Sequence, residues 1–336
     1  MPTSDARALA APLAALALGG CAGAPDILRA AGEPAGSQAA LGSWTTGIAL
    51  LVVVAMAALL VAALRRGRRG PGPEPGSPVS ADPPGGLRWI YAGTGASVLV
   101  LLGVMLATAA GLARGGPGPE AVVVEVTGKR WWWEVRYPGD RVEDGFVTAN
   151  EIHVPVGRPV RLRLTSADVI HSFWVPQLGG KTDMIPGTVN ESWFRADRPG
   201  VYRGQCGEYC GRQHARMALV VVAQAPAEFA AWQERQRSAA AAPPPGEARV
   251  GRRVFEQRCA ACHTVRGTRA LGEAGPDLTH LAGRRTLAGG TLPNTPAALR
   301  RWIRDPQGAK PGTLMPDVPL RDDELRATVA YLQHLR

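Results

Sequence analysis

The chain has 336 residues, a formal net charge of +10 and 46% hydrophobic residues. Such a positive charge can indicate nucleic-acid binding, but most arginines are scattered, and the one dense cluster directly follows an apolar run. That position is typical of a membrane protein and argues against a nucleic-acid-binding protein. Apolar runs separated by polar linkers predict several small units instead of one large core.

The amino terminus resembles an export signal. Residues 8 to 20 are small and mostly apolar, and they end directly before Cys21. This pattern predicts a secretory signal over residues 1–21. The segment also resembles a bacterial lipoprotein signal, in which Cys21 would carry the lipid; ordinary cleavage or an unmodified thiol is the alternative.

Two long apolar runs predict a transmembrane hairpin over residues 43–114, with spans at about 47–64 and 89–113. Each run has about the length needed to cross a hydrocarbon core of about 30 Å. The loop between them is rich in Pro and Gly and carries the arginine cluster Arg65, Arg66, Arg68 and Arg69. Positive loops stay in the cytoplasm, so the residues after 115 are expected outside. A hairpin buried in a soluble protein is the alternative.

Short β-branched or alternating runs follow, separated by turn residues. Strands at this spacing predict a β-sandwich or barrel over residues 120–225. The predicted strands are 122–126, 131–137, 151–156, 159–164, 191–196 and 218–222.

A twelve-residue segment from Cys206 to Met217 contains two thiols, an imidazole, a thioether and a carboxylate. It is too short to be anything but a loop between strands. Soft sulfur ligands together with imidazole favour copper, and two cysteines four residues apart can direct both sulfurs at one point. A disulfide between Cys206 and Cys210, or a zinc site, is the alternative.

A second candidate ligand, His171, lies in the apolar segment Asp168-Val-Ile-His-Ser-Phe-Trp-Val-Pro176. A lone histidine in such a segment is more often a core residue than a ligand. This segment, the cysteine loop, the two apolar runs and Gly180-Lys-Thr-Asp-Met-Ile-Pro-Gly187 together resemble cytochrome c oxidase subunit II. That family has a cupredoxin-like periplasmic domain with the dinuclear copper centre CuA.

The resemblance implies a role for each residue of the site. Cys206 and Cys210 would bridge two coppers, and Glu208 would give a backbone carbonyl to one of them and its side chain to a magnesium shared with the catalytic subunit. Trp131 would be the residue through which electrons enter, although its ring could instead only pack the sandwich. The remaining copper ligands would be His171, His214 and Met217. Many family members also have a glutamate at the start of the second span, where this chain has Leu87-Arg88-Trp89-Ile90.

Residues 226–246 end in a run of Ala and Pro and predict a linker to a second exported domain, residues 247–336. Cys259-Ala-Ala-Cys262-His263 is the attachment sequence of c-type haem. A thioredoxin-like redox pair is the alternative. The region resembles a small class I cytochrome c, which implies Met315 as the second axial ligand, with His280 as a rival, and a last helix from about Asp322.

These features predict a multidomain chain with a two-helix transmembrane hairpin, an all-β cupredoxin-like sandwich and an all-α cytochrome c domain. The fusion resembles subunit II of caa-type oxidases. It implies an electron relay from a soluble or membrane-bound donor through haem c and CuA to catalytic subunit I of a haem-copper oxidase, alongside its further subunits. It also implies a bacterial inner membrane, with both metal domains on the periplasmic face. The same relay serving a nitric oxide reductase, or a membrane-anchored copper-binding protein without an enzymatic partner, is the alternative.

Overall fold

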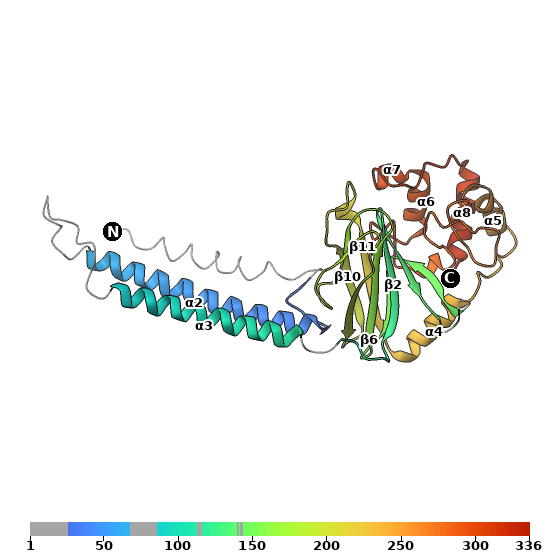
Figure 1. The fold of residues 1–336 in the computed structure, drawn as a ribbon. Coiled ribbons are helices and arrows are strands. Elements are labelled where there is room, and N and C mark those ends of the chain that lie inside the picture. The colour runs from blue at the N-terminus through green and yellow to red at the C-terminus, as the bar shows by residue number, and fades with distance from the viewer. Residues whose placement is uncertain (1–25, 68–85, 113–115, 140, 142–143) are drawn as a thin grey trace, which may run out of the picture. The chain divides into compact units, whose positions relative to one another are not determined.

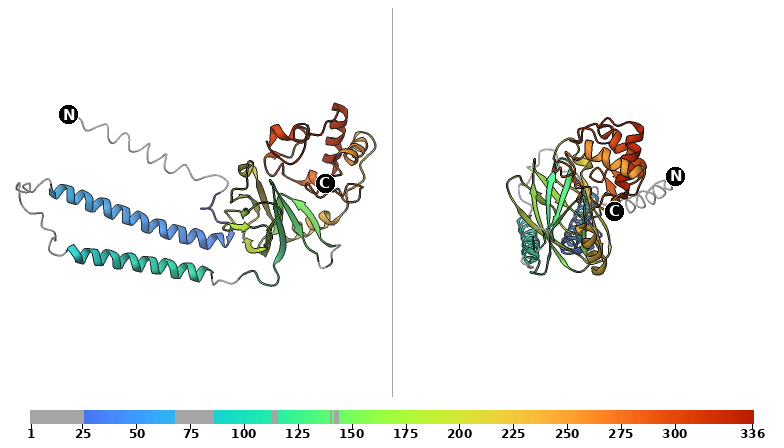
Figure 2. Two further views of the ribbon diagram at one scale, coloured as in Figure 1. Left: turned by 45° about the horizontal axis from the view of Figure 1, so that its top comes forward. Right: turned by 90° about the vertical axis from the view of Figure 1, so that its right-hand side faces the viewer.

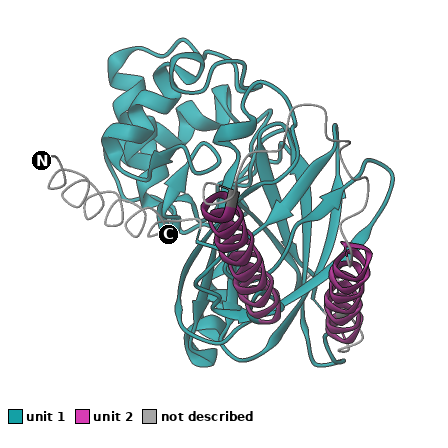
Figure 3. Cartoon of the chain, turned by 90° about the vertical axis from the view of Figure 1, so that its left-hand side faces the viewer, with its two compact units in different colours: residues 1–36, 117–336 teal, residues 37–116 magenta. Residues whose placement is uncertain are grey.

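The computed structural model describes residues 26–67, 86–112, 116–139, 141 and 144–336. The chain divides into two compact units, of which one is formed by residues 37–116 and the other by the described residues on either side of that segment (Figure 3). The predicted signal with Cys21, and the arginines at positions 68 and 69, lie outside the described residues.

The first unit consists of the helices α2 (Ala35–Gly67) and α3 (Gly86–Leu112). Their apolar side chains are exposed on all sides, as at Leu51 and Leu99, which excludes a hairpin buried in a protein core. The helix α2 begins at Ala35, well before the predicted span at 47–64, and at 1.5 Å per residue it is about 50 Å long. Only its apolar middle matches a core of about 30 Å. The pair is a membrane anchor by length and composition.

The second unit begins with two β-sheets that face each other (Figures 1 and 2). One sheet has the strand order β1-β9-β6-β2-β3-β4 and the other has the order β5-β11-β10-β7-β8. The predicted sandwich is therefore confirmed. The strands are β1 (Gly32–Glu33), β2 (Val122–Lys129), β3 (Trp132–Tyr137), β4 (Phe146–Ala149), β5 (Glu151–Pro155), β6 (Pro159–Ser166), β7 (His171–Trp174), β8 (Thr182–Met184), β9 (Asn190–Ala196), β10 (Gly200–Cys206) and β11 (Ala218–Gln224).

Buried and partly exposed residues alternate along the strands, and the buried ones form the core of the sandwich. In β2, Val124 and Val126 are fully buried while the residues between and beside them are partly exposed, and Trp133 of β3 is fully buried. Period-two burial is what a sheet with one covered face requires. The sequence pattern missed β1, β4, β7, β8 and β10, which are short or carry polar residues on their outer positions.

The first half of the predicted linker is an ordered helix, α4 (Pro226–Arg237). Its Phe229 and Trp232 are buried in the core of the sandwich. The indole of Trp232 stacks on the ring of His153 with 4.2 Å between centroids, and it meets Tyr137 edge-on at 5.2 Å. The helix therefore belongs to the sandwich domain.

The carboxy-terminal domain is helical and has its own core. It contains α5 (Glu247–Arg258), α6 (Pro296–Arg304), α7 (Pro306–Ala309) and α8 (Asp322–His334), with a small hairpin of β12 (Thr286–Leu287) and β13 (Leu292–Pro293). The first and last helices pack together through Phe255 and Tyr331, whose ring centroids lie 5.6 Å apart. The predicted start of the last helix at Asp322 is confirmed.

Replacing Trp232 by alanine should destabilise the exported region by about 3–5 kcal/mol, because a large buried ring is lost and a cavity remains. Denaturant unfolding of the full chain, followed by near-ultraviolet circular dichroism, measures the change. The matched control is Glu234→Ala on the same helix, where the side chain is 82% exposed and the expected change lies within about 0.5 kcal/mol. Equal effects of the two substitutions would show that α4 is not part of the core.

Candidate copper and haem sites

The loop from Cys206 to Met217 joins β10 to β11, and its two ends are tied together. The Cys206 amide donates to the Met217 carbonyl at 3.0 Å, and the two strands continue as an antiparallel pair below that bond. Within the loop, His214–Arg216 form one turn of 3₁₀-helix. The segment is a loop between strands, as predicted, but the strand before it is β10, which the sequence pattern did not identify.

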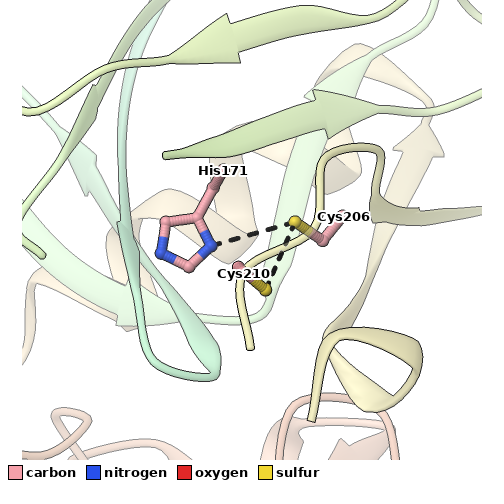
Figure 4. A group of neighbouring side chains, drawn as sticks. All are labelled: His171, Cys206 and Cys210. Atoms are coloured by element: carbon pink, nitrogen blue, oxygen red, sulfur yellow. Dashed lines mark hydrogen bonds between the residues drawn. The ribbon is translucent and has the colours of Figure 1, made fainter. Parts of the chain in front are cut away.

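His171 reaches the same loop from the neighbouring strand. It is the first residue of β7, which pairs with β10 so that Phe173 lies opposite Cys206. The imidazole is fully buried and its Nδ1 atom points at the sulfur of Cys206 (Figure 4). Sheet pairing therefore brings together two segments that lie 35 residues apart in the chain.

The donor atoms of the predicted copper ligands form a connected series of short separations. The two sulfurs of Cys206 and Cys210 are 3.7 Å apart, and each has an imidazole nitrogen of its own. The other separations are 3.8 Å from His171 Nδ1 to Cys206 Sγ, 3.6 Å from His214 Nδ1 to Cys210 Sγ, 3.8 Å from Met217 Sδ to Cys210 Sγ and 3.1 Å from the Glu208 carbonyl to Cys206 Sγ.

These separations fit donors that share a metal ion. Two donors bound at 2.0–2.3 Å in a tetrahedral arrangement lie about 3.6 Å apart. Thiolate, thioether and imidazole are the soft and intermediate ligands that suit copper. The residues present therefore fit a copper site.

The two thiols differ in acidity because they are in contact. Hydrogen bonding to Cys210 lowers the pKa of Cys206 to about 3, although burial acts in the opposite direction. The same contact raises the pKa of Cys210 well above its usual value. Without a cation, one thiolate and one thiol are the stable pair, so binding a metal to both sulfurs releases a proton.

Asp168 orients the buried imidazole, and the sequence prediction missed it. Its Oδ1 lies 2.8 Å from His171 Nε2, which leaves Nδ1 free to face the sulfur. Burial lowers the pKa of His171, but the hydrogen bonds to Cys206 and Asp168 outweigh this effect and raise it overall. Burial raises the pKa of Asp168, and hydrogen bonds to His171 and to backbone amides more than reverse that effect. The only signal in the sequence was its position three residues before the histidine.

Glu208 directs its carbonyl towards the sulfurs and its side chain towards solvent. The residue is exposed, and among the described residues only the neighbouring Tyr209 amide donates a hydrogen bond to its carboxylate. Tyr209 is itself 75% exposed. An exposed carboxylate next to an exposed ring is available to a partner.

Trp131 lies directly before β3 and connects two parts of the unit. It is buried, and its indole nitrogen donates to the Cys210 carbonyl at 2.9 Å. Trp131 also lines a cavity of about 270 Å³ in company with Trp132. Trp131 therefore bonds to the backbone of a predicted copper ligand and also forms part of the cavity lining.

Arg130 and Asn150 of the sandwich also line that cavity, and the rest of its lining belongs to the carboxy-terminal domain. This part includes all the residues of the predicted haem site, namely Cys259, Cys262, His263 and Met315. Most other lining side chains are apolar, among them Phe255 and Leu332. An apolar cavity with two thiols and an imidazole at its edge fits a covalently attached haem.

The hydrogen bonding of His263 leaves one ring nitrogen available to bind a metal. Its Nδ1 donates to the Pro276 carbonyl at 2.8 Å, which leaves Nε2 as the free donor atom. Burial lowers the pKa of His263, so the imidazole is neutral at pH 7, as a metal ligand must be. Gly275 makes room for the ring, since a Cβ there would lie 2.6 Å from it.

His280 is placed elsewhere. Its two ring nitrogens face the carbonyl oxygens of Arg336 and Ser238 at 2.7 and 3.1 Å, and it does not line the cavity. Of the two candidates for second axial ligand, the structure places only Met315 at the cavity.

Replacing Asp168 by asparagine should lower the copper affinity of the full chain about tenfold to a hundredfold, because the imidazole loses the anion that fixes its orientation. Competition titration against a copper chelator measures this affinity. Asp183→Asn, an exposed position on β8, is the matched control and should leave affinity unchanged. Equal affinities for the two variants would contradict a positioning role for Asp168.

Two protein families match the two exported domains. The family described as cytochrome c oxidase subunit II, periplasmic domain, matches residues 141–224, and the family described as cytochrome c matches residues 248–336. The first family implies copper and the second implies haem.

Named relatives agree with these matches. Cytochrome c oxidase subunit 2 of Alkalihalophilus pseudofirmus is 41% identical over 217 residues, which cover 64% of this chain and 61% of the relative. The protein of the same name from Bacillus subtilis is 33% identical over 230 residues, covering 65% of this chain and 63% of the relative. The chain thus spans about three fifths of the length of these relatives.

Among solved structures, the periplasmic domain of subunit II of cytochrome oxidase of Bradyrhizobium japonicum is 37% identical. The match covers 35% of this chain and 96% of that domain, with a TM-score of 0.33. By the two family matches, residues 141–224 resemble the periplasmic domain of cytochrome c oxidase subunit II and residues 248–336 resemble cytochrome c.

Proposed function

We propose that the chain is the electron-transfer subunit II of a haem-copper terminal oxidase. It takes electrons from a soluble or membrane-bound donor and delivers them to catalytic subunit I, which reduces oxygen to water and pumps protons. The observation that carries this proposal is the position of Trp131, which lines the cavity of the cytochrome c domain and donates a hydrogen bond to the Cys210 carbonyl.

The copper site holds two ions. His171 and His214 approach different sulfurs, and His214 lies outside the set His171, Cys206 and Cys210, whose donor atoms all lie within 4.8 Å of one another. A single ion between the sulfurs would draw on one shared set. Cys206 and Cys210 would hold two ions together with His171 and His214, and Met217 and the Glu208 carbonyl would supply the remaining donors.

The haem and the copper pair supply one-electron oxidation and reduction when bound. The protein would contribute their positions: Cys259 and Cys262 would hold the haem covalently, and His263 and Met315 would bind its iron. Trp131 provides a short connected route from the cavity wall to the backbone of Cys210. The tied ends of the copper loop keep the ligands in place while the charge of the centre changes.

The exposed side of the copper loop faces the partner. The Glu208 side chain is directed to solvent and would bind a magnesium ion shared with catalytic subunit I. The helices α2 and α3 anchor the chain in a bacterial inner membrane, and the arginines after the first span keep the connecting loop inside and both metal domains in the periplasm.

The test is optical and electron paramagnetic resonance spectroscopy of the full chain loaded with haem and copper. We expect a low-spin c-type haem band together with the signal of a mixed-valence dinuclear copper centre. A mononuclear blue-copper spectrum would contradict the dinuclear assignment. Oxygen consumption by the complex with its catalytic subunit distinguishes this function from nitric oxide reduction.

Replacing Met315 by alanine should leave the haem attached through Cys259 and Cys262 but lower its reduction potential, since a thioether ligand raises the potential of a haem. Spectroscopic redox titration measures the change. His280→Ala is the control and should leave the potential near that of the parent chain, because both ring nitrogens are bonded away from the cavity. The opposite result, a lower potential in the His280 variant alone, would assign His280 as the ligand.

A further inference from the structure

One buried charge in the carboxy-terminal domain has no role in the function proposed so far. Lys310 follows the short helix α7 and is only 2% exposed. Lysine is rare in this chain: Lys129 and Lys181 are the only others, against a combined Lys and Arg total of 38. Burying an ammonium group is costly unless its hydrogen bonds are satisfied, so the surroundings of Lys310 must be specific.

The Lys310 ammonium donates to three backbone carbonyls. The acceptors are Trp131 at 2.8 Å, Arg216 at 2.9 Å and Ala288 at 2.8 Å. An ammonium has three N–H donors, so each donor has one acceptor and none is left over. A neutral amine would turn its lone pair towards one of these oxygens, and the planar five-donor guanidinium of arginine would not match the arrangement.

The three carbonyls belong to segments that border the haem cavity or the copper loop. Trp131 borders the haem cavity, Arg216 precedes the copper ligand Met217, and Ala288 belongs to the loop of the cytochrome c domain between β12 and β13. Burial lowers the pKa of Lys310 to about 7, and attraction to Cys210 acts against this effect. The Arg216 carbonyl that accepts from the ammonium lies one residue before Met217, so the charge is next to the copper loop.

The backbone approaches closely around this ammonium. Gly289 has a φ of +65°, and a Cβ there would lie 2.8 Å from the Trp131 carbonyl and 2.9 Å from Lys310 Nζ. The Gly289 carbonyl accepts a hydrogen bond from the Ala218 amide at 2.9 Å, at the start of β11. Only glycine fits at this point of contact between the two domains.

A second buried charge makes the reciprocal contact. Glu151 of β5 is 3% exposed, and its carboxylate accepts hydrogen bonds from the backbone amides of Arg285 and Thr286 in the cytochrome c domain. Each domain thus places one buried charged side chain on the backbone of the other. Such contacts define a single docked geometry, because misalignment leaves a buried charge without partners.

We propose that Lys310 is a positioning residue for electron transfer within the chain: its ammonium holds the haem cavity against Trp131 and the copper loop, with Glu151 as the second anchor. This inference rests on the proposed function. The step it serves moves one electron: ferrous haem is oxidised to ferric haem, the copper pair is reduced by one electron, and no bond forms or breaks.

The test uses the full chain with haem and copper, carrying Lys310→Met, Lys310→Arg or the control Arg301→Met. Arg301 is an exposed arginine on α6, so its replacement removes one positive charge from the same domain without touching the contact. Fast photoreduction of the haem at pH 6, below the pKa of Lys310, then follows electron transfer to copper.

Lys310→Met should slow this first-order transfer about tenfold or more, because three backbone carbonyls lose their donor and the docked geometry is less populated. It should also lower the copper midpoint potential, since a nearby positive charge favours the reduced centre. Lys310→Arg should slow the transfer but keep the potential, and Arg301→Met should change neither. In the parent chain the rate should be insensitive to salt because the charge is buried.

Amide hydrogen exchange on the copper-free chain measures the stability of the domain contact without requiring bound copper. Lys310→Met should increase exchange at the Ala218 and Arg285 amides, which donate across the contact, and Arg301→Met should not. Unchanged exchange, transfer rate and potential in Lys310→Met would overturn the inference. Loss of the haem band or the dinuclear copper signal in the parent chain would instead overturn the proposed function.

Discussion

The separation of 3.7 Å between the sulfurs of Cys206 and Cys210 is the constraint on which the copper site depends. The hydrogen bond between the two sulfur groups lowers the pKa of Cys206 and raises the pKa of Cys210, so one of the two sulfurs keeps its proton. The pairing of β10 with β11 and the bond from the Cys206 amide to the Met217 carbonyl hold the loop in this conformation. The sheet therefore holds both sulfurs at a separation that suits binding to a shared metal ion, which would displace the remaining proton.

The contact between the two exported domains is built on backbone groups. Lys310 donates to carbonyls, and Glu151 accepts from amides, so the identity of the contacted side chains matters little. The contacted carbonyls themselves lie next to functional residues, because Arg216 precedes Met217 in the copper loop and Trp131 bonds to Cys210. A shift of one domain relative to the other would consequently move the predicted copper ligands. A displacement of these ligands would in turn alter the contact between the domains.

The sequence predicted what depends on local pattern and spacing. The sandwich, the helical domain and the cysteine loop followed from strand alternation and from short motifs, and the two domain families are confirmed. What it missed depends on tertiary contact. The helix α4 was assigned to a linker because the side chains that it buries, Phe229, Trp232 and Gln236, become buried only when the rest of the chain covers them. Asp168 lies only three residues before His171, but spacing alone does not show that its carboxylate bonds to the imidazole. Glu151 and Lys310 carry no motif, since they bond to backbone groups of the other domain.

The covalent linker between the two exported domains explains how a contact that buries charged side chains can still be populated. Desolvating an ammonium and a carboxylate consumes much of the attraction they gain, so these charges add geometric selectivity more than affinity. Between separate proteins such a contact would be weakly populated. On one chain, residues 238–246 keep the domains at an effective concentration in the millimolar range, and modest affinity is then sufficient. Because the domains are covalently connected, the contact does not have to be strong. It can instead favour the one geometry that aligns the haem cavity with Trp131.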